Sequence, residues 1–222
     1  MATKPKQPSQ NVTEAMAPPD YWAKACAELM KQDRILRKMI PKYPQAEFLT
    51  TRGDPFLTLA RAIVGQQISV KAAQSIWDRV IATSKKFSAT QVLKTDLTEL
   101  REAGLSARKV EYLRDLANHF VNGGLGHANW DQLDDETVIK ELVAIRGIGR
   151  WTAEMFLIFH LLRPNVLPLD DVGLINGISK NYFSGESVSR SEAREVSAAW
   201  APYRSVATWY IWRSLDPLPV DY

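Results

Sequence analysis

Apolar side chains recur every three or four residues along most of the chain from residue 21 onward. Three clear runs are Trp22, Cys26, Leu29 and Met30; Val110, Leu113, Leu116, Ala117 and Phe120; and Val138, Leu142 and Ile145. This spacing places the members of each run on one face of an α-helix. Sustained alternation of apolar and polar positions with β-branched residues, which is typical of strands, is missing from the sequence. The pattern therefore predicts an all-α protein.

Residues that start and end helices divide this pattern into about ten short helices. Predicted N-caps are Asp54 before Pro55, Ser106, and Ser189 in a capping box with Glu192. Predicted helix ends are Pro41 and Pro44, Asn122-Gly123-Gly124, and Pro164. Most connections are short, and the sequence has neither a fixed-period repeat nor a long linker. We therefore expect two helical lobes joined by crossing helices rather than separate domains.

The first 20 residues have a different character from the rest of the chain. They contain four prolines and several polar residues, and they show no hydrophobic periodicity. We expect a disordered tail over residues 1–20 and a single two-lobed helical domain over residues 21–222.

Composition excludes several classes of protein. The chain has 222 residues, 45% hydrophobic and 24% charged, which is typical of a globular protein. It has no apolar stretch of about 18 residues and no hydrophobic signal core, so we expect a soluble intracellular protein without membrane association. A single cysteine, Cys26, excludes an intrachain disulfide, a cysteine-held zinc and a four-cysteine iron–sulfur cluster. Because His119, His127 and His160 lack carboxylate or cysteine partners at ligand spacing, no metal site is predicted.

Charge is unevenly distributed although its net value is only +3. Residues 21–115 contain 17 basic and 10 acidic side chains. This excess could form a shallow basic face for a nucleic acid, but an ordinary solvated surface explains it equally well.

The segment at residues 146–150, RGIGR, predicts a tight hairpin between two helices. Because glycine has no Cβ, Gly147 and Gly149 let the backbone turn sharply and approach another backbone closely. A helix that begins near Arg150 presents free N–H groups, which form a phosphate site, and Arg146 and Arg150 add positive charge. A turn of this kind between helices is also common without any ligand.

A pair of adjacent carboxylates follows the hairpin, with Asp171 standing twenty positions after Trp151. One aspartate would be the N-cap of a helix that starts near Val172, which is a usual position for this residue type. Since there are two carboxylates, Asp170 and Asp171, one can cap the helix while the other faces a site.

Three separated motifs together resemble the helix-hairpin-helix DNA glycosylase superfamily, and within it the DNA-3-methyladenine glycosylase II family. They are Arg61-Ala62-Ile63-Val64-Gly65-Gln66-Gln67-Ile68-Ser69, the hairpin with its trailing Asp171, and Trp200-Ala201-Pro202-Tyr203-Arg204-Ser205 followed by Trp209, Tyr210 and Trp212. The resemblance extends from about Pro55 to Leu215. It implies a two-lobed helical fold with an active-site cleft between the lobes and a helix-hairpin-helix at about residues 138–163.

The resemblance implies a monofunctional DNA glycosylase that hydrolyses the N-glycosidic bond of alkylated purines, such as 3-methyladenine and 7-methylguanine, in base excision repair. Asp171 would be the catalytic carboxylate. Relatives that also cut the DNA strand carry a Schiff-base lysine at the position of Trp151, and tryptophan cannot be that nucleophile. We therefore expect no lyase activity. The alternatives are a non-catalytic helix-hairpin-helix DNA-binding protein and a glycosylase of the same fold for other damaged bases.

The base pocket implied by the resemblance consists of Trp151, Trp212, Met155 and Tyr203. An aromatic face stabilises a cationic base by about 0.5–2 kcal/mol, which offsets part of the cost of removing it from the stack. Some relatives have an aromatic ring where Met155 stands. Because the chain has seven tryptophans, the alternative is that these rings belong to the core.

The resemblance also implies a surface for double-stranded DNA with damaged bases. Gln67 is our choice for the side chain that fills the gap left by the extruded base, with Gln66 and Ile68 as alternatives. The glutamines could instead satisfy buried backbone groups, and Arg204 could be a structural ion-pair partner. The other predicted DNA contacts are Ser69, Arg146, Gly147, Gly149, Arg150, Thr152 and Arg204.

No organic cofactor is predicted, but the resemblance implies that hairpin carbonyls can hold a monovalent cation, Na⁺ or K⁺. We expect a monomer. The expected location is the cytoplasm, associated with the nucleoid, for a bacterial source and the nucleus for a eukaryotic one.

Overall fold

The computed structural model describes residues 17–44, 47–51, 53–127 and 129–215. Within these ranges all regular structure is helical, which confirms the all-α prediction. The α-helices are α1 (Trp22–Gln32), α2 (Arg34–Met39), α3 (Pro55–Gly65), α4 (Val70–Ala82), α5 (Ala89–Lys94), α6 (Leu97–Glu102), α7 (Ala107–Val121), α8 (Asp135–Val143), α9 (Arg150–Phe159), α10 (Val172–Tyr182), α11 (Arg190–Val196) and α12 (Arg204–Arg213). The 3₁₀-helices are η1 (Ile40–Lys42), η2 (Leu125–His127), η3 (Trp130–Gln132) and η4 (Ser197–Trp200). Residues 1–16 of the predicted tail lie outside the described residues.

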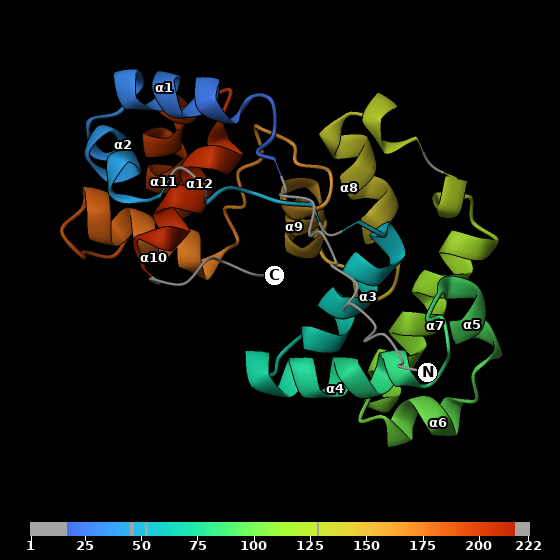
Figure 1. The fold of residues 1–222 in the computed structure, drawn as a ribbon. Coiled ribbons are helices and arrows are strands. Elements are labelled where there is room, and N and C mark those ends of the chain that lie inside the picture. Colours follow the sequence, from blue (N-terminus) through green and yellow to red (C-terminus); the bar gives the residue numbers. More distant parts are fainter. Residues whose placement is uncertain (1–16, 45–46, 52, 128, 216–222) are drawn as a thin grey trace, which may run out of the picture.

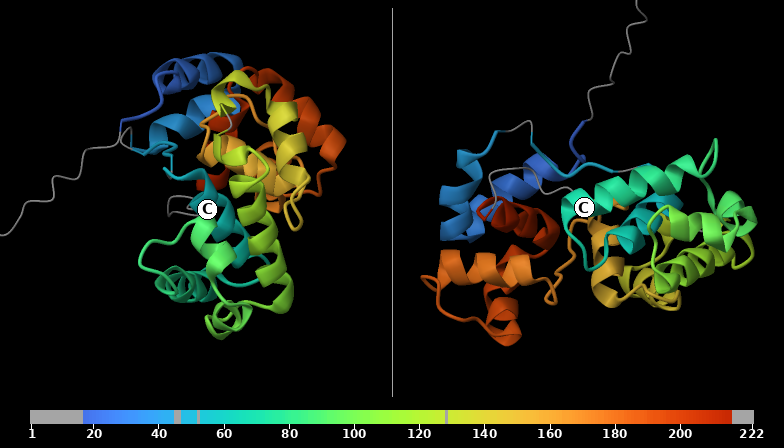
Figure 2. Two further views of the ribbon diagram at one scale, coloured as in Figure 1. Left: turned by 90° about the vertical axis from the view of Figure 1, so that its right-hand side faces the viewer. Right: turned by 90° about the horizontal axis from the view of Figure 1, so that it is seen from below.

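The helices form two lobes, as predicted (Figure 1). One lobe is continuous in sequence and contains α3 to α9, whereas the other combines α1 and α2 with α10, α11 and α12 (Figure 2). In the second lobe the Trp22 ring of α1 meets the Trp209 ring of α12 edge-on at 5.4 Å between ring centroids. No helix within the described residues has the length and apolar character needed to cross a lipid bilayer.

The predicted apolar faces are the core-facing sides of their helices. Leu29, Leu113, Leu116, Val138 and Leu142 have no exposed surface. Burying a side chain of this size contributes about 1.5–3 kcal/mol to folding, so these faces account for much of the packing between helices.

The predicted helix starts are confirmed by their capping hydrogen bonds. Asp54 accepts a hydrogen bond from the Leu57 amide at 2.9 Å, with Pro55 at the first position of α3. Ser106 caps α7, and Ser189 forms the predicted capping box with Glu192 at the start of α11. These side chains supply acceptors for amides that have no partner within the helix.

Two predicted helix ends are wrong. The first helix does not continue to Pro41, because Asp33 interrupts it and accepts hydrogen bonds from the amides of Ile35 and Leu36, which starts α2. Helix α9 ends at Phe159, several residues before Pro164. The Asp33 side chain thus divides the first segment, whereas α9 ends in backbone hydrogen bonds from Leu161 to Phe156 and from Arg163 to Leu157.

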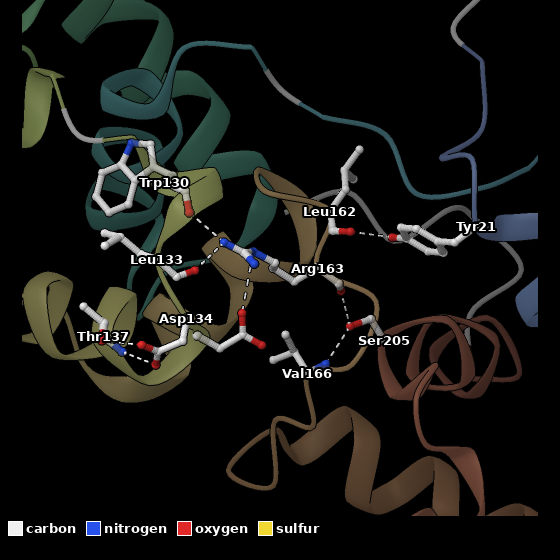
Figure 3. A network of polar contacts seen from close by, with 10 residues as sticks. Tyr21, Trp130, Leu133, Asp134, Thr137, Leu162, Arg163, Val166 and Ser205 are labelled. Atoms are coloured by element: carbon white, nitrogen blue, oxygen red, sulfur yellow. Dashed lines mark hydrogen bonds and ion pairs between the residues drawn. The ribbon is translucent and has the colours of Figure 1, made fainter.

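Arg163 connects the two lobes through the segment that follows α9 (Figure 3). Its Nη2 atom donates to the carbonyls of Trp130 and Leu133 in the first lobe, at 2.6 and 2.8 Å. Its own carbonyl accepts a hydrogen bond from Ser205 Oγ of α12 at 2.6 Å, and Ser205 Oγ accepts from the Val166 amide. This network fixes the chain that leads to Asp171.

Candidate functional site

Asp171 lies where the two lobes meet, and both of its carboxylate oxygens are hydrogen-bonded. Oδ1 accepts from the Leu174 amide at 2.5 Å, which caps α10, and from Trp212 Nε1 at 2.7 Å. Oδ2 accepts from Trp151 Nε1 at 3.0 Å. Trp151 belongs to α9 of the first lobe and Trp212 to α12 of the second, so one carboxylate joins both lobes.

The charge of this carboxylate is balanced by dipoles rather than by a cation. Asp171 is only 4% exposed, and it belongs to none of the ion pairs found among the described residues. Three N–H donors and the N-terminal end of α10 offset the cost of burying the charge. A positive charge that forms nearby would interact with it strongly, because water screens little at such a position.

Asp170 has a different environment although it is the neighbouring residue. Its side chain is half exposed and forms an ion pair with Arg190 at 2.8 Å. The structure thus separates the two carboxylates, with Asp171 at the junction and Asp170 on the surface. The two aspartates do not divide the roles as the sequence allowed, since Asp171 both caps α10 and lies at the junction.

The four predicted pocket residues differ in how much of each side chain is accessible. Trp151 is half-buried, while Trp212, Met155 and Tyr203 are buried. The Trp212 ring stacks on the Phe159 ring at 5.7 Å between centroids. A base that approached this structure could therefore meet the Trp151 ring, whereas the other three would first have to become exposed.

Gly173 was not predicted from the sequence, yet it leaves room for the carboxylate cluster. A Cβ at this position would lie 3.1 Å from Asp171 Oδ1 and 3.2 Å from Trp212 Cδ1. Either contact would move one of the two partners. The signal was present in the sequence, since this glycine stands at the second position of a predicted helix, where glycine is unfavourable.

The hairpin between α8 and α9 gives its two glycines different roles. Gly147 has φ +86°, and a Cβ there would overlap the Tyr112 ring, with 2.2 Å to Cδ2. The close approach is therefore to a side chain and not, as predicted, to another backbone. Gly149 is the N-cap of α9 and has no protein atom within 4 Å of a Cβ, so it faces open space.

The predicted basic residues of the hairpin are paired with carboxylates. The Arg146 guanidinium lies 3.6 Å from Asp115 and 3.9 Å from Glu111 of α7. Arg150 Nε donates to Glu154 at 3.0 Å, and its Nη1 donates to Glu136 at 3.0 Å. Both arginine side chains are half or more exposed, so phosphates would compete with these carboxylates for them.

Glu154 is a buried carboxylate beside this pair, and sequence reasoning missed it. It is 5% exposed, and its Oε2 atom has no hydrogen-bond partner. Burial raises the pKa of Glu154 to about 7, although Arg150 opposes the shift.

The loop between α3 and α4 exposes the predicted wedge. Gln67 has φ +59° and an exposed side chain. Gln66 instead turns inward, and its Nε2 atom donates to the Gly147 carbonyl at 2.8 Å. This glutamine therefore satisfies a backbone group, which was the alternative to a role as the wedge. Ser69 is exposed and caps α4, and Ile68 is also exposed.

Two further predicted DNA contacts are restricted by the surrounding protein, one by burial and one by a hydrogen bond. The Thr152 side chain is buried, so only its backbone amide at the start of α9 can reach a ligand. Arg204 Nε donates to the Ser197 carbonyl at 3.5 Å. The described residues include no cluster of three or more histidine, cysteine, aspartate or glutamate side chains able to hold a metal ion.

A family model covers most of the region that contains these sites. Residues 60–202 match the model described as HhH-GPD superfamily base excision DNA repair protein. The chain belongs to this superfamily. The match includes the loop that carries Gln67, the hairpin and Asp171, so these three features lie in the part that HhH-GPD proteins share.

Similar sequences and structures support the HhH-GPD assignment. DNA-3-methyladenine glycosylase 1 of Schizosaccharomyces pombe is 33% identical over 165 residues, which cover 72% of each chain. DNA-3-methyladenine glycosidase from Bacillus halodurans has a TM-score of 0.78 at 37% identity, covering 86% of this chain and 89% of the other. The S. pombe 3-methyladenine DNA glycosylase bound to abasic DNA has a TM-score of 0.75 at 29% identity, covering 90% of this chain and 100% of the other. The two-lobed HhH-GPD fold is therefore confirmed.

Proposed function

We propose that this HhH-GPD protein is a monofunctional DNA glycosylase that excises alkylated purines. The observation that carries the proposal is the buried Asp171 carboxylate, which two indole N–H groups hold at the junction of the lobes and which has no cationic partner among the described residues. The similarity to 3-methyladenine glycosylases supports the substrate class.

The proposed chemistry needs a fixed negative charge. An N3- or N7-alkylated purine is positively charged, so it is a good leaving group without strong acid catalysis. As it leaves, the sugar develops oxocarbenium character. Asp171 would stabilise this cation and orient the water that attacks it. Because its oxygens are already held by Trp151, Trp212 and Leu174, it needs little reorganisation when the charge develops.

DNA would be held by the hairpin and the Gln67 loop. The amides at the start of α9 would face a phosphate through the open space at Gly149, and Gln67 would fill the gap left by the extruded base. The half-buried Trp151 ring is the surface on which a cationic base would stack.

The test is to incubate the protein with duplex DNA that contains 3-methyladenine, 7-methylguanine, hypoxanthine or 1-methyladenine and to identify the released bases. We expect release of 3-methyladenine and 7-methylguanine. Binding without release of any base would favour the non-catalytic alternative. Release of other bases only would favour a glycosylase of different specificity.

The absence of lyase activity is also proposed, because the Trp151 indole offers no amine for a Schiff base. The DNA product should be an intact strand with an abasic site, and borohydride should trap no covalent adduct. A strong trapped adduct would overturn this part of the proposal.

A monovalent cation at the hairpin is proposed as a structural aid to phosphate binding. Two hairpin carbonyls already have protein donors, since Ile145 O accepts from the Ile148 amide and Gly147 O from Gln66. A backbone carbonyl has two lone pairs, so each of these oxygens keeps one that a cation could use. DNA affinity measured in potassium chloride and in tetramethylammonium chloride at equal ionic strength tests this. Sedimentation of the same samples tests the proposed monomer.

A further inference from the structure

One face of α7 contacts both loops that are proposed to bind DNA. Lys109, Tyr112 and Asp115 are spaced three residues apart and therefore lie along one side of the helix. Lys109 contacts the end of α3, beside Gln67, while Tyr112 and Asp115 contact the hairpin.

The contact of Lys109 is specific and charged. Its Nζ atom donates to the carbonyls of Val64 at 2.7 Å and Gln66 at 2.8 Å, which lie at the C-terminal end of α3. These carbonyls have no partner within the helix, and the negative end of the helix dipole favours a cation there. Lys109 is half-buried, and this burial lowers the pKa of its ammonium group.

The hairpin is held to α7 at two successive residues. The Arg146 amide donates to Asp115 Oδ2 at 2.8 Å. At Gly147 the backbone lies against the Tyr112 ring so closely that a Cβ would not fit. Gln66 closes the arrangement, because its Nε2 atom donates to the Gly147 carbonyl across the two loops.

We propose that Lys109, Gln66, Tyr112 and Asp115 form a brace that sets the distance between the Gln67 loop and the hairpin. The inference rests on the proposed function. The hairpin holds the DNA backbone, and Gln67 enters the base stack a fixed distance away. In this arrangement Lys109 and Gln66 are positioning residues for extrusion of the base. They act on the step before bond cleavage and not on the cleavage itself.

The brace predicts an effect that depends on how firmly the target base is stacked and paired. A misplacement of about 1 Å can lower a rate about 100-fold. Extrusion costs least when the base is unpaired, so a badly placed Gln67 should matter least there. A residue that only maintains the fold would change excision equally on both kinds of DNA.

The experiment compares single-turnover excision of 7-methylguanine from two duplexes. In one the lesion faces cytosine, and in the other it faces a stable abasic-site analogue. Lys109→Met removes the donor while keeping an unbranched side chain, and Gln66→Met does the same from the other end of the brace. Arg108→Met is the matched control, because it removes the same charge from an exposed neighbouring position of α7.

Both brace variants should slow excision of the paired lesion at least about 10-fold and leave excision of the unpaired lesion nearly unchanged. The control should behave like the wild type on both duplexes. Equal losses on the two duplexes, or no loss on either, would overturn the brace. If Lys109→Met fails to fold, Gln66→Met decides alone. Failure of the wild type to release any alkylated base would instead overturn the proposed function.

Discussion

Asp171 combines two features that the sequence allowed to be divided between two residues, the cap of α10 and a position at the junction of the lobes. Local sequence signals do not decide which aspartate of the pair caps the helix and which one faces a site. The structure shows that Oδ1 of Asp171 caps α10 while both oxygens accept indole hydrogen bonds. Residue spacing pointed to Asp171, the aspartate that lies at the junction of the lobes, but its two indole contacts come from residues 20 and 41 positions away and could not be read from the spacing.

Asp171→Asn should lower the excision rate on the order of 100- to 1000-fold, because it removes the charge opposite the developing sugar cation. Asparagine caps helices about as well as aspartate, so α10 should keep its start. Its NH₂ group cannot accept from Trp151 Nε1 as Oδ2 does, so the melting temperature should fall while the variant still folds and binds lesion DNA. Single-turnover kinetics and thermal unfolding of the same preparation check both statements.

Asp170→Asn is the matched control, since its carboxylate is half exposed and paired with Arg190. Excision should stay at the wild-type rate. If Asp170 and not Asp171 proved essential, the assignment would be wrong by one residue.

Glu154 makes stability depend on pH. Because burial raises its pKa from 4.5 to about 7, the folded state binds this proton more tightly than the unfolded state. The contribution to stability is therefore complete below about pH 4.5 and is lost as pH rises to about 7. In the wild type, the unfolding free energy should therefore fall as the pH rises from 5 to 8. In Glu154→Gln this fall should be smaller by on the order of 2 kcal/mol, because glutamine does not titrate.

Urea unfolding at several pH values measures this effect. Glu102→Gln, at an exposed position of α6, is the control and should keep the wild-type slope. An unchanged slope in Glu154→Gln would show that another group titrates.

The hairpin motif predicts a tight turn, but it does not predict which of its two glycines the turn requires. Both glycines were expected to permit a tight turn, and the turn is present. Only the structure distinguishes Gly147, whose backbone conformation and contact with Tyr112 need glycine, from Gly149, which faces open space. The difference depends on α7, which the motif itself does not contain.

Gly147→Ala should therefore destabilise the protein by about 1–3 kcal/mol or more, because a left-handed backbone adds to the overlap with Tyr112. Gly149→Ala should cost at most about 1 kcal/mol, the difference between glycine and alanine as an N-cap. Its methyl group would occupy the open space through which a phosphate is proposed to reach the α9 amides, so DNA binding should weaken. The loss should be similar for all DNA sequences, since backbone contacts carry no base information. Unfolding curves and DNA titrations separate the two effects, and equal loss of stability in both variants would contradict this assignment.

At the level of the entire chain, helix type and two-lobed organisation could be predicted, because apolar periodicity and capping residues are local signals. Contacts between lobes could not. Arg163 is an ordinary basic residue in the sequence, yet it donates to two carbonyls of one lobe while its carbonyl binds Ser205 of the other. Such contacts depend on the final arrangement of distant segments.

Arg163→Met should lower the unfolding free energy by about 1–3 kcal/mol, because the Trp130 and Leu133 carbonyls lose their donor. Arg190→Met removes an exposed ion pair with Asp170 and should cost less than about 1 kcal/mol. Equilibrium denaturation of the two variants provides the comparison. Equal losses would mean that the network in Figure 3 contributes no more than a surface pair.

One lobe is formed by segments that lie before and after the other lobe in the sequence, and this also determines when the carboxylate cluster is completed during synthesis. Helices α3 to α9 are continuous, so their lobe and its hairpin can form on a growing chain as domains generally do, from the N-terminal side. The partners of α1 and α2 are made after this lobe. Since Trp212 belongs to α12, Asp171 gains its second indole only after α12 has left the ribosome. A nascent chain therefore has its proposed phosphate-binding turn before the hydrogen bonds around the proposed catalytic carboxylate are complete.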